Sequence, residues 1–160
     1  MTAVNYADMP KLLLIVAHAP SPNTQRLRDA LADAARESGA VGVRCLSPFD
    51  TNAGDVLAAD GMLLFTTENL GTMSGALKDF FDRTYYDVLE KKQGLPYALA
   101  IRAGNDGRGT QRAVETIVTG LRWRAAAEAL ILRGEFQERF VGQCRELGAA
   151  MAAGLETGVL

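Results

Sequence analysis

The segment 18–24 (HAPSPNT) combines two prolines and a serine with an Asn-Thr pair, and these residue types could bind an anion. It follows a short apolar run and precedes an amphipathic stretch, so we expect a stiff turn that leads into a helix. Hydroxyl groups and unpaired backbone N–H groups at a helix N-terminus favour an anion such as phosphate. Helix capping by Asn23 or Thr24 would explain the same residues without a ligand, so both interpretations stay open.

Two further polar loops could contact a flat ligand. The loop 66–74 (TTENLGTMS) leads directly into the helical segment GALKDFFDR, and a loop of this length can wrap a ring with its main chain. The loop 102–109 (RAGNDGRG) has three glycines in six residues, which let backbone amides approach a planar ligand closely. Without a ligand, the first would be an ordinary connection with a turn at Gly71, and the second a mobile surface connection.

Alternating strands and helices must position these loops. The connections are short, so the pattern predicts an α/β fold with a parallel sheet and helices on both faces. Ligands of such sheets bind at the carboxyl ends of the strands, which is where all three loops lie. We expect strands at 11–17, 41–46, 62–66, 97–102 and 127–132, and helices at 24–38, 74–89, around 114–121, and at 136–155. The alanines near 127–132 would also suit a helix.

Composition excludes several classes of protein. The 160 residues suit one domain, 1–160, with a leader over residues 1–10. The net charge of −2 provides no basic stripe for nucleic acid, and the apolar run 12–17 is too short for a membrane span or a signal peptide. Cys45 and Cys144 have no metal-ligand spacing, which favours reduced thiols in a cytoplasmic protein over one disulfide. A single histidine, His18, excludes a histidine-based metal cluster and suits a capping or packing role.

The middle loop resembles a known family. TTENLGTMSGALKDFFDR is similar to the TPE-x-x-G-x-x-x-GALKN-x-x-D segment of flavodoxin-like FMN oxidoreductases, which include NADPH-dependent FMN reductases and NAD(P)H:quinone reductases. HAPSPNTQRL resembles their phosphate loop, and the third loop and the tail CRELGAAMAAGLETG also fit, so the resemblance extends over the whole chain. It implies a flavodoxin-like, doubly wound, five-stranded parallel sheet of order 2-1-3-4-5 in three α/β/α layers.

The resemblance also implies an FMN site made by all three loops. Thr67 stands where the family usually has proline, and Pro20 and Pro22 stiffen a phosphate loop that is commonly rich in glycine. The residues implied for the phosphate are Ser21, Asn23 and Thr24. The residues implied for the ring are Thr67, Glu68, Asn69, Leu70, Gly71 and Thr72 on one side, and Ala103, Gly104, Asn105 and Asp106 on its other rim.

By resemblance, the chain is an enzyme, an FMN-dependent NAD(P)H:acceptor oxidoreductase. A nicotinamide nucleotide would pass a hydride to the flavin, and a quinone-like or other small acceptor would then replace it. Such chemistry needs no general acid or base, and no ribose-phosphate reader distinguishes NADH from NADPH in this sequence. Reductases of this kind often build the nicotinamide site between subunits, which is compatible with a homodimer or a higher homo-oligomer.

Two other functions stay open. A flavodoxin-type carrier would shuttle single electrons between protein partners, and it should have a strongly acidic docking face and aromatic residues that sandwich the ring. The net charge of −2 and the presence of Leu70 in the ring loop favour the enzyme. A binding or regulatory domain could also keep the fold without redox turnover.

Overall fold

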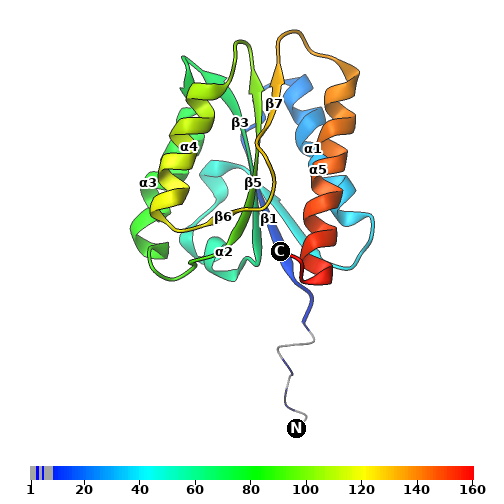
Figure 1. The fold of residues 1–160 in the computed structure, drawn as a ribbon, viewed down its shortest axis with the longest axis vertical. Helices are drawn as coiled ribbons and strands as arrows, with labels where there is room; N and C mark the ends of the chain where they lie inside the picture. Colours follow the sequence, from blue (N-terminus) through cyan, green and yellow to red (C-terminus); the bar gives the residue numbers. More distant parts are fainter. Residues whose placement is uncertain (1–2, 4, 6–8) are drawn as a thin grey trace.

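The computed structural model describes residues 3, 5 and 9–160, so the leader expected over residues 1–10 lies mostly outside the described residues. In the described part, strands and helices alternate along the chain (Figure 1). The strands are β1 (Leu12–Ala17), β2 (Gly42–Leu46), β3 (Gly61–Asn69), β4 (Thr72–Met73), β5 (Pro96–Ala103), β6 (Arg124–Ala125) and β7 (Leu130–Arg133). The helices are α1 (Pro22–Arg36), the short 3-10 turn η2 (Pro48–Asp50), α2 (Ala53–Ala58), α3 (Gly75–Val88), α4 (Arg108–Gly120) and α5 (Glu138–Thr157).

The sheet has the strand order β2-β1-β3-β5, with β6 and β7 both beside β5, and all of these neighbours run parallel. If β6 and β7 count as one interrupted strand, this is the expected order 2-1-3-4-5. Helices connect the strands because a parallel pair needs a crossover connection. The predicted flavodoxin-like fold class is therefore confirmed.

The prediction of five strands is wrong in two places. The fifth strand, predicted at 127–132, is interrupted: β6 and β7 flank residues 126–129, which lie outside the sheet. Alanine and glutamate, which make up that stretch, are depleted in strands. The second place is the expected loop 66–74, where β3 continues to Asn69 and the chain folds back as the antiparallel strand β4.

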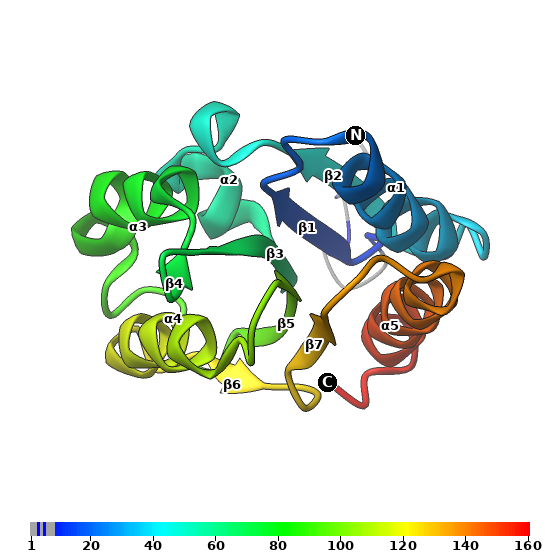
Figure 2. The same cartoon turned by 90° about the horizontal axis from the view of Figure 1, so that it is seen from above.

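Helices cover both faces of the sheet, with α1 and α5 on one face and α2, α3 and α4 on the other (Figure 2). In β1, Leu13 and Ile15 pack under α1 and α5, whereas Leu14 and Val16 belong to the core on the opposite face. All four side chains are fully buried. A strand covered on both faces is apolar without alternation, which explains the uninterrupted apolar run in the sequence.

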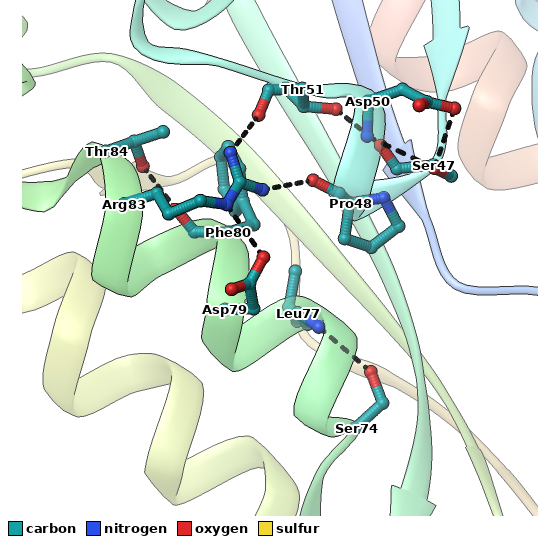
Figure 3. Close-up of polar contacts among 10 residues, drawn as sticks. All are labelled: Ser47, Pro48, Asp50, Thr51, Ser74, Leu77, Asp79, Phe80, Arg83 and Thr84. Atoms are coloured by element: carbon teal, nitrogen blue, oxygen red, sulfur yellow. Dashed lines mark hydrogen bonds and ion pairs between the residues drawn. The ribbon is translucent and has the colours of Figure 1, made fainter.

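Arg83 of α3 fixes the connection that follows β2 (Figure 3). Its Nη1 donates to the Thr51 carbonyl at 2.9 Å and its Nη2 to the Pro48 carbonyl at 2.7 Å. The Nε of the same guanidinium donates to Asp79 at 2.7 Å, which orients the fork. One side chain thus satisfies two loop carbonyls and holds the carboxyl end of β2 against α3.

Candidate functional site

The three polar loops meet at the carboxyl edge of the sheet, which is at the top of Figure 1 and faces the viewer in Figure 2. They follow β1, β3 and β5, which are direct neighbours in the sheet. The backbone N–H of His18, at the end of β1, donates to the Phe65 carbonyl in β3 at 2.9 Å. The three loops therefore lie together at the carboxyl edge of the sheet.

The first loop ends in a reciprocal helix cap. Helix α1 begins at Pro22 rather than Thr24, because Ser21 is its N-cap. The Thr24 N–H donates to Ser21 Oγ at 3.2 Å, and the Ser21 N–H donates to Thr24 Oγ1 at 2.9 Å. In the described part of the chain, the backbone N–H groups of Ala19 and Asn23 have no hydrogen-bond partner. These two amides are the ones left for an anion.

The second loop is a tight β-hairpin. Asn69 pairs with Thr72, and the two residues between them, Leu70 and Gly71, have φ values of 52° and 81°. Two central residues with positive φ define a type I′ turn, in which Asn-Gly is the favoured pair. Leu70 is therefore in a conformation that costs a residue with a Cβ free energy. Its side chain is also fully exposed, at 105% of the reference area.

Glu68 joins this hairpin to the third loop. Its Oε1 accepts from the Asn105 N–H at 2.9 Å and its Oε2 from the Gly107 N–H at 2.8 Å. The two loops also touch directly, since a Cβ on Gly109 would overlap the Gly71 carbonyl. The two ring-facing segments expected from the sequence are thus brought together, although Glu68 reaches loop amides rather than open space.

The glycines of the third loop differ in how closely other atoms pack around them. Gly107 has φ +72°, and a Cβ on it would lie 2.6 Å from Ile131. A Cβ on Gly104, by contrast, would have no heavy atom within 4 Å, and the same is true of Gly71 in the hairpin. Close packing therefore explains Gly107, while space lies open beside Gly104 and Gly71.

A cavity of about 690 Å³ adjoins the hairpin. Its lining is mostly apolar and includes Leu70, and it continues onto α3 and α4. The sequence does not predict this cavity, because its shape depends on how closely α3 and α4 approach each other in the fold. The lining residues are Asn69, Leu70, Thr72, Met73, Gly75, Lys78, Ala113, Thr116 and Ile117.

His18 is half-buried, and burial lowers the pKa of its imidazole below the ordinary value. Burial therefore disfavours the charged form of this side chain. Among the described residues, no three His, Cys, Asp or Glu side chains gather in a way that could hold a metal ion. No helix in that part of the chain is long and apolar enough to cross a bilayer.

A model of the family described as NADPH-dependent FMN reductase matches residues 49–136, which is more than half of the chain. The chain belongs to the NADPH-dependent FMN reductase family. The matched region contains the hairpin and the third loop, which are the segments that Glu68 joins. The first loop lies outside it, and so do Pro20 and Pro22, where the sequence departs from the phosphate loop usual in this reductase family.

Individual relatives of this reductase-family chain are flavodoxins. A flavodoxin of Aquifex aeolicus (strain VF5) is 28% identical over 109 residues, or 68% of the chain, and the chain spans only 59% of that relative's length. A flavodoxin from the domain Archaea superposes with a TM-score of 0.77 at 19% identity, covering 91% of this chain and 99% of the other. Megasphaera elsdenii flavodoxin gives 0.73 at 20% identity, covering 88% and 98%. At these identities the two structures show the shared fold.

Proposed function

We propose that the whole chain forms one FMN-binding unit and acts as an NAD(P)H:acceptor oxidoreductase, with the flavin at the carboxyl edge of the sheet. The observation that supports this most is Leu70. A fully exposed leucine with φ 52° is unfavourable for two reasons. The turn favours Asn or Gly at this position, and exposure of an apolar side chain to water costs free energy. Strain of this kind persists where function needs it, and an apolar side chain at this edge suits contact with a flat ring.

The residues at this edge fit FMN. The free amides of Ala19 and Asn23 offer donors to a phosphate at the N-terminus of α1, and the Ser21 hydroxyl, which is hydrogen-bonded to Thr24 Oγ1 at 2.8 Å, lies at the same helix end. The space beside Gly71 and beside Gly104 is open, which leaves room for a ring to lie against these two loops. We therefore keep all thirteen residues inferred from the sequence as the proposed site, with Glu68 acting through the third loop.

Bound FMN would supply the redox chemistry, taking a hydride from the nicotinamide and returning two electrons to an acceptor. The protein's own residues bind and orient. An acceptor that needs protons can take them from solvent, because the exposed edge does not exclude water. We assign the acceptor, a quinone-like or other small apolar ring, to the cavity beside Leu70, whose 690 Å³ is within the range of small-molecule sites.

A flavodoxin-type electron carrier is the second candidate, and the flavodoxin relatives favour it. A carrier docks through an uncompensated acidic face. On α3, however, Asp79 pairs with Arg83 and Asp82 pairs with Lys78, at 2.7 Å and 2.6 Å. These pairs neutralise two acidic residues of α3, which supports the enzyme.

Anaerobic reduction distinguishes the two functions. The protein would be loaded with FMN, freed of excess flavin, and mixed with NADPH or NADH while the flavin absorbance is followed. Bleaching within seconds, followed by recovery when a quinone is added, is expected of the reductase. The reductase would be contradicted if neither nucleotide reduces the flavin. Accumulation of a one-electron-reduced flavin with dithionite would then favour the carrier.

A further inference from the structure

The carboxylate of Glu68 spans two backbone amides of the third loop, and both of its oxygens are used. The loop is also held from its other side, because Arg133 Nε donates to the Asp106 carbonyl at 2.7 Å. Asp106 lies between the two amides that Glu68 accepts. The third loop is thus fixed by an acceptor on one side and a donor on the other, with no ligand needed.

Glu68 forms no ion pair with a Lys, Arg or His side chain among the described residues, although Arg133 donates to the same loop at the Asp106 carbonyl. The hydrogen bonds of Glu68 come only from neutral backbone N–H groups. These groups solvate the carboxylate but leave its net charge of −1 in place.

The same hydrogen bonds remove donors from the ring site. Backbone amides near Asn105 would be the natural groups to stabilise negative charge on a reduced flavin. The structure gives the Asn105 and Gly107 amides to Glu68 instead. A ring bound against the hairpin and the third loop would therefore lie near this carboxylate, and the amides of Asn105 and Gly107 would not be free to donate to it.

We propose that Glu68 is a positioning residue for the bound flavin, which fixes the third loop against the hairpin and disfavours the reduced, more negative state of the ring. This inference rests on the proposed function, since it needs FMN at this edge. Its consequence is a lower reduction potential, and so a flavin that gives up its electrons readily to an acceptor.

The test compares the unmodified protein with Glu68→Gln and Glu68→Asp, and with Glu115→Gln as the matched control. Glu115 is an exposed carboxylate on α4 that accepts from Gln111 at 2.8 Å. Glutamine has the size of glutamate, but it has one oxygen acceptor and no charge. Aspartate keeps the charge but is one methylene too short to span both amides.

Two measurements separate the role of Glu68 in fixing the third loop from the effect of its charge on bound FMN. Hydrogen exchange in the flavin-free protein reports the third loop directly, and we expect the amides of Asn105 and Gly107 to exchange at least about tenfold faster in both Glu68 variants. The potential of bound FMN reports the charge. We expect Glu68→Gln to favour reduced over oxidised FMN by about tenfold, which is about +30 mV for two electrons, while Glu68→Asp and Glu115→Gln stay near the unmodified value.

Each failure has its own meaning. Unchanged exchange in Glu68→Gln would overturn the positioning role, whatever happens with FMN. Equal weakening of oxidised and reduced FMN, with no shift in potential, would overturn the charge effect and leave only a structural role. If the unmodified protein holds no FMN, the proposed function fails and takes the charge effect with it, while the exchange result still decides the role of Glu68 in the loop.

Discussion

Replacing Leu70 by asparagine should stabilise the flavin-free protein and weaken its binding of FMN. The side chain of Leu70 is fully exposed, so its removal sacrifices no buried apolar surface in the absence of ligand. Its backbone has φ 52° beside Gly71 at 81°, and asparagine accepts this conformation more readily than leucine. The two effects therefore have opposite signs and can be measured separately.

The magnitude for the flavin-free protein comes from the turn. A left-handed conformation costs a residue with a Cβ roughly 1–2 kcal/mol, and asparagine relieves part of this through local hydrogen bonding. We expect the free energy of unfolding to rise by about 1 kcal/mol, or about 2–4 °C in Tm for a chain of this size. For FMN, loss of about 40 Å² of apolar contact at about 25 cal/mol per Å² is about 1 kcal/mol, or about fivefold in Kd.

Urea unfolding of the flavin-free protein and fluorescence titration with FMN provide the two numbers. Leu70→Ala is the matched control, because alanine also removes the apolar contact but keeps the cost of a Cβ in the turn. Alanine should therefore weaken FMN binding without the gain in stability. An unfolding free energy that falls in Leu70→Asn, or FMN binding unaffected by either variant, would refute the reasoning about Leu70.

Three further predictions concern the scaffold. A Cβ on Gly148 of α5 would overlap a carbonyl of α1, so Gly148→Ala should lower the free energy of unfolding by about 1–3 kcal/mol. Gly142 lies in open space on the same helix, so Gly142→Ala should raise the free energy of unfolding by about 0.5–1 kcal/mol. Chemical denaturation measures both values, and equal effects of the two variants would contradict the packing of α5 against α1. Arg83→Lys gives up the two-carbonyl fork and should cost about 1–2 kcal/mol by the same measurement; a neutral result would show that the fork is dispensable. Burial raises the pKa of Cys144 to about 12, so its thiol should resist a thiol reagent at pH 8 until the protein is unfolded. The stability that this neutral thiol provides should be lost as the pH rises from about 9 toward 12. Because Cys45 is a second, less buried thiol, labelling is assigned by peptide mass, and rapid labelling of Cys144 in the folded protein would contradict this.

The strands were predictable where burial on both faces dictates the residues. The apolar runs of β1 and β3 identify them as central strands, and the short connections order the rest of the sheet. The interrupted strand at 124–133 was not predictable in detail, because its alanines suit several conformations and only pairing with β5 decides which residues join the sheet. Periodicity carries no information about such a partner.

The site was predictable as three loops but not as a network. Positive φ at Leu70 is unexpected from the sequence, since the favoured residue would be Asn, and so the sequence of residues 66–74 predicts a loop and no hairpin. Glu68 accepts hydrogen bonds from Asn105 and Gly107, which are more than 35 residues away in the sequence, and no local sequence pattern predicts such contacts. The sequence indicates Asn23 or Thr24 as the cap of α1, whereas the structure has Ser21 as the N-cap, paired with Thr24.

The most direct test of the central claim is the stoichiometry and affinity of FMN binding to the unmodified protein. Titration of the flavin-free protein into FMN, followed by quenching of flavin fluorescence, would be compared with Asn23→Asp, which places a negative charge beside the proposed phosphate position, and with Leu70→Asn, which alters the other end of the proposed site. We predict one FMN per chain, with weaker binding in each variant. No saturable binding, or binding that neither variant changes, would contradict an FMN site at the carboxyl edge of this sheet.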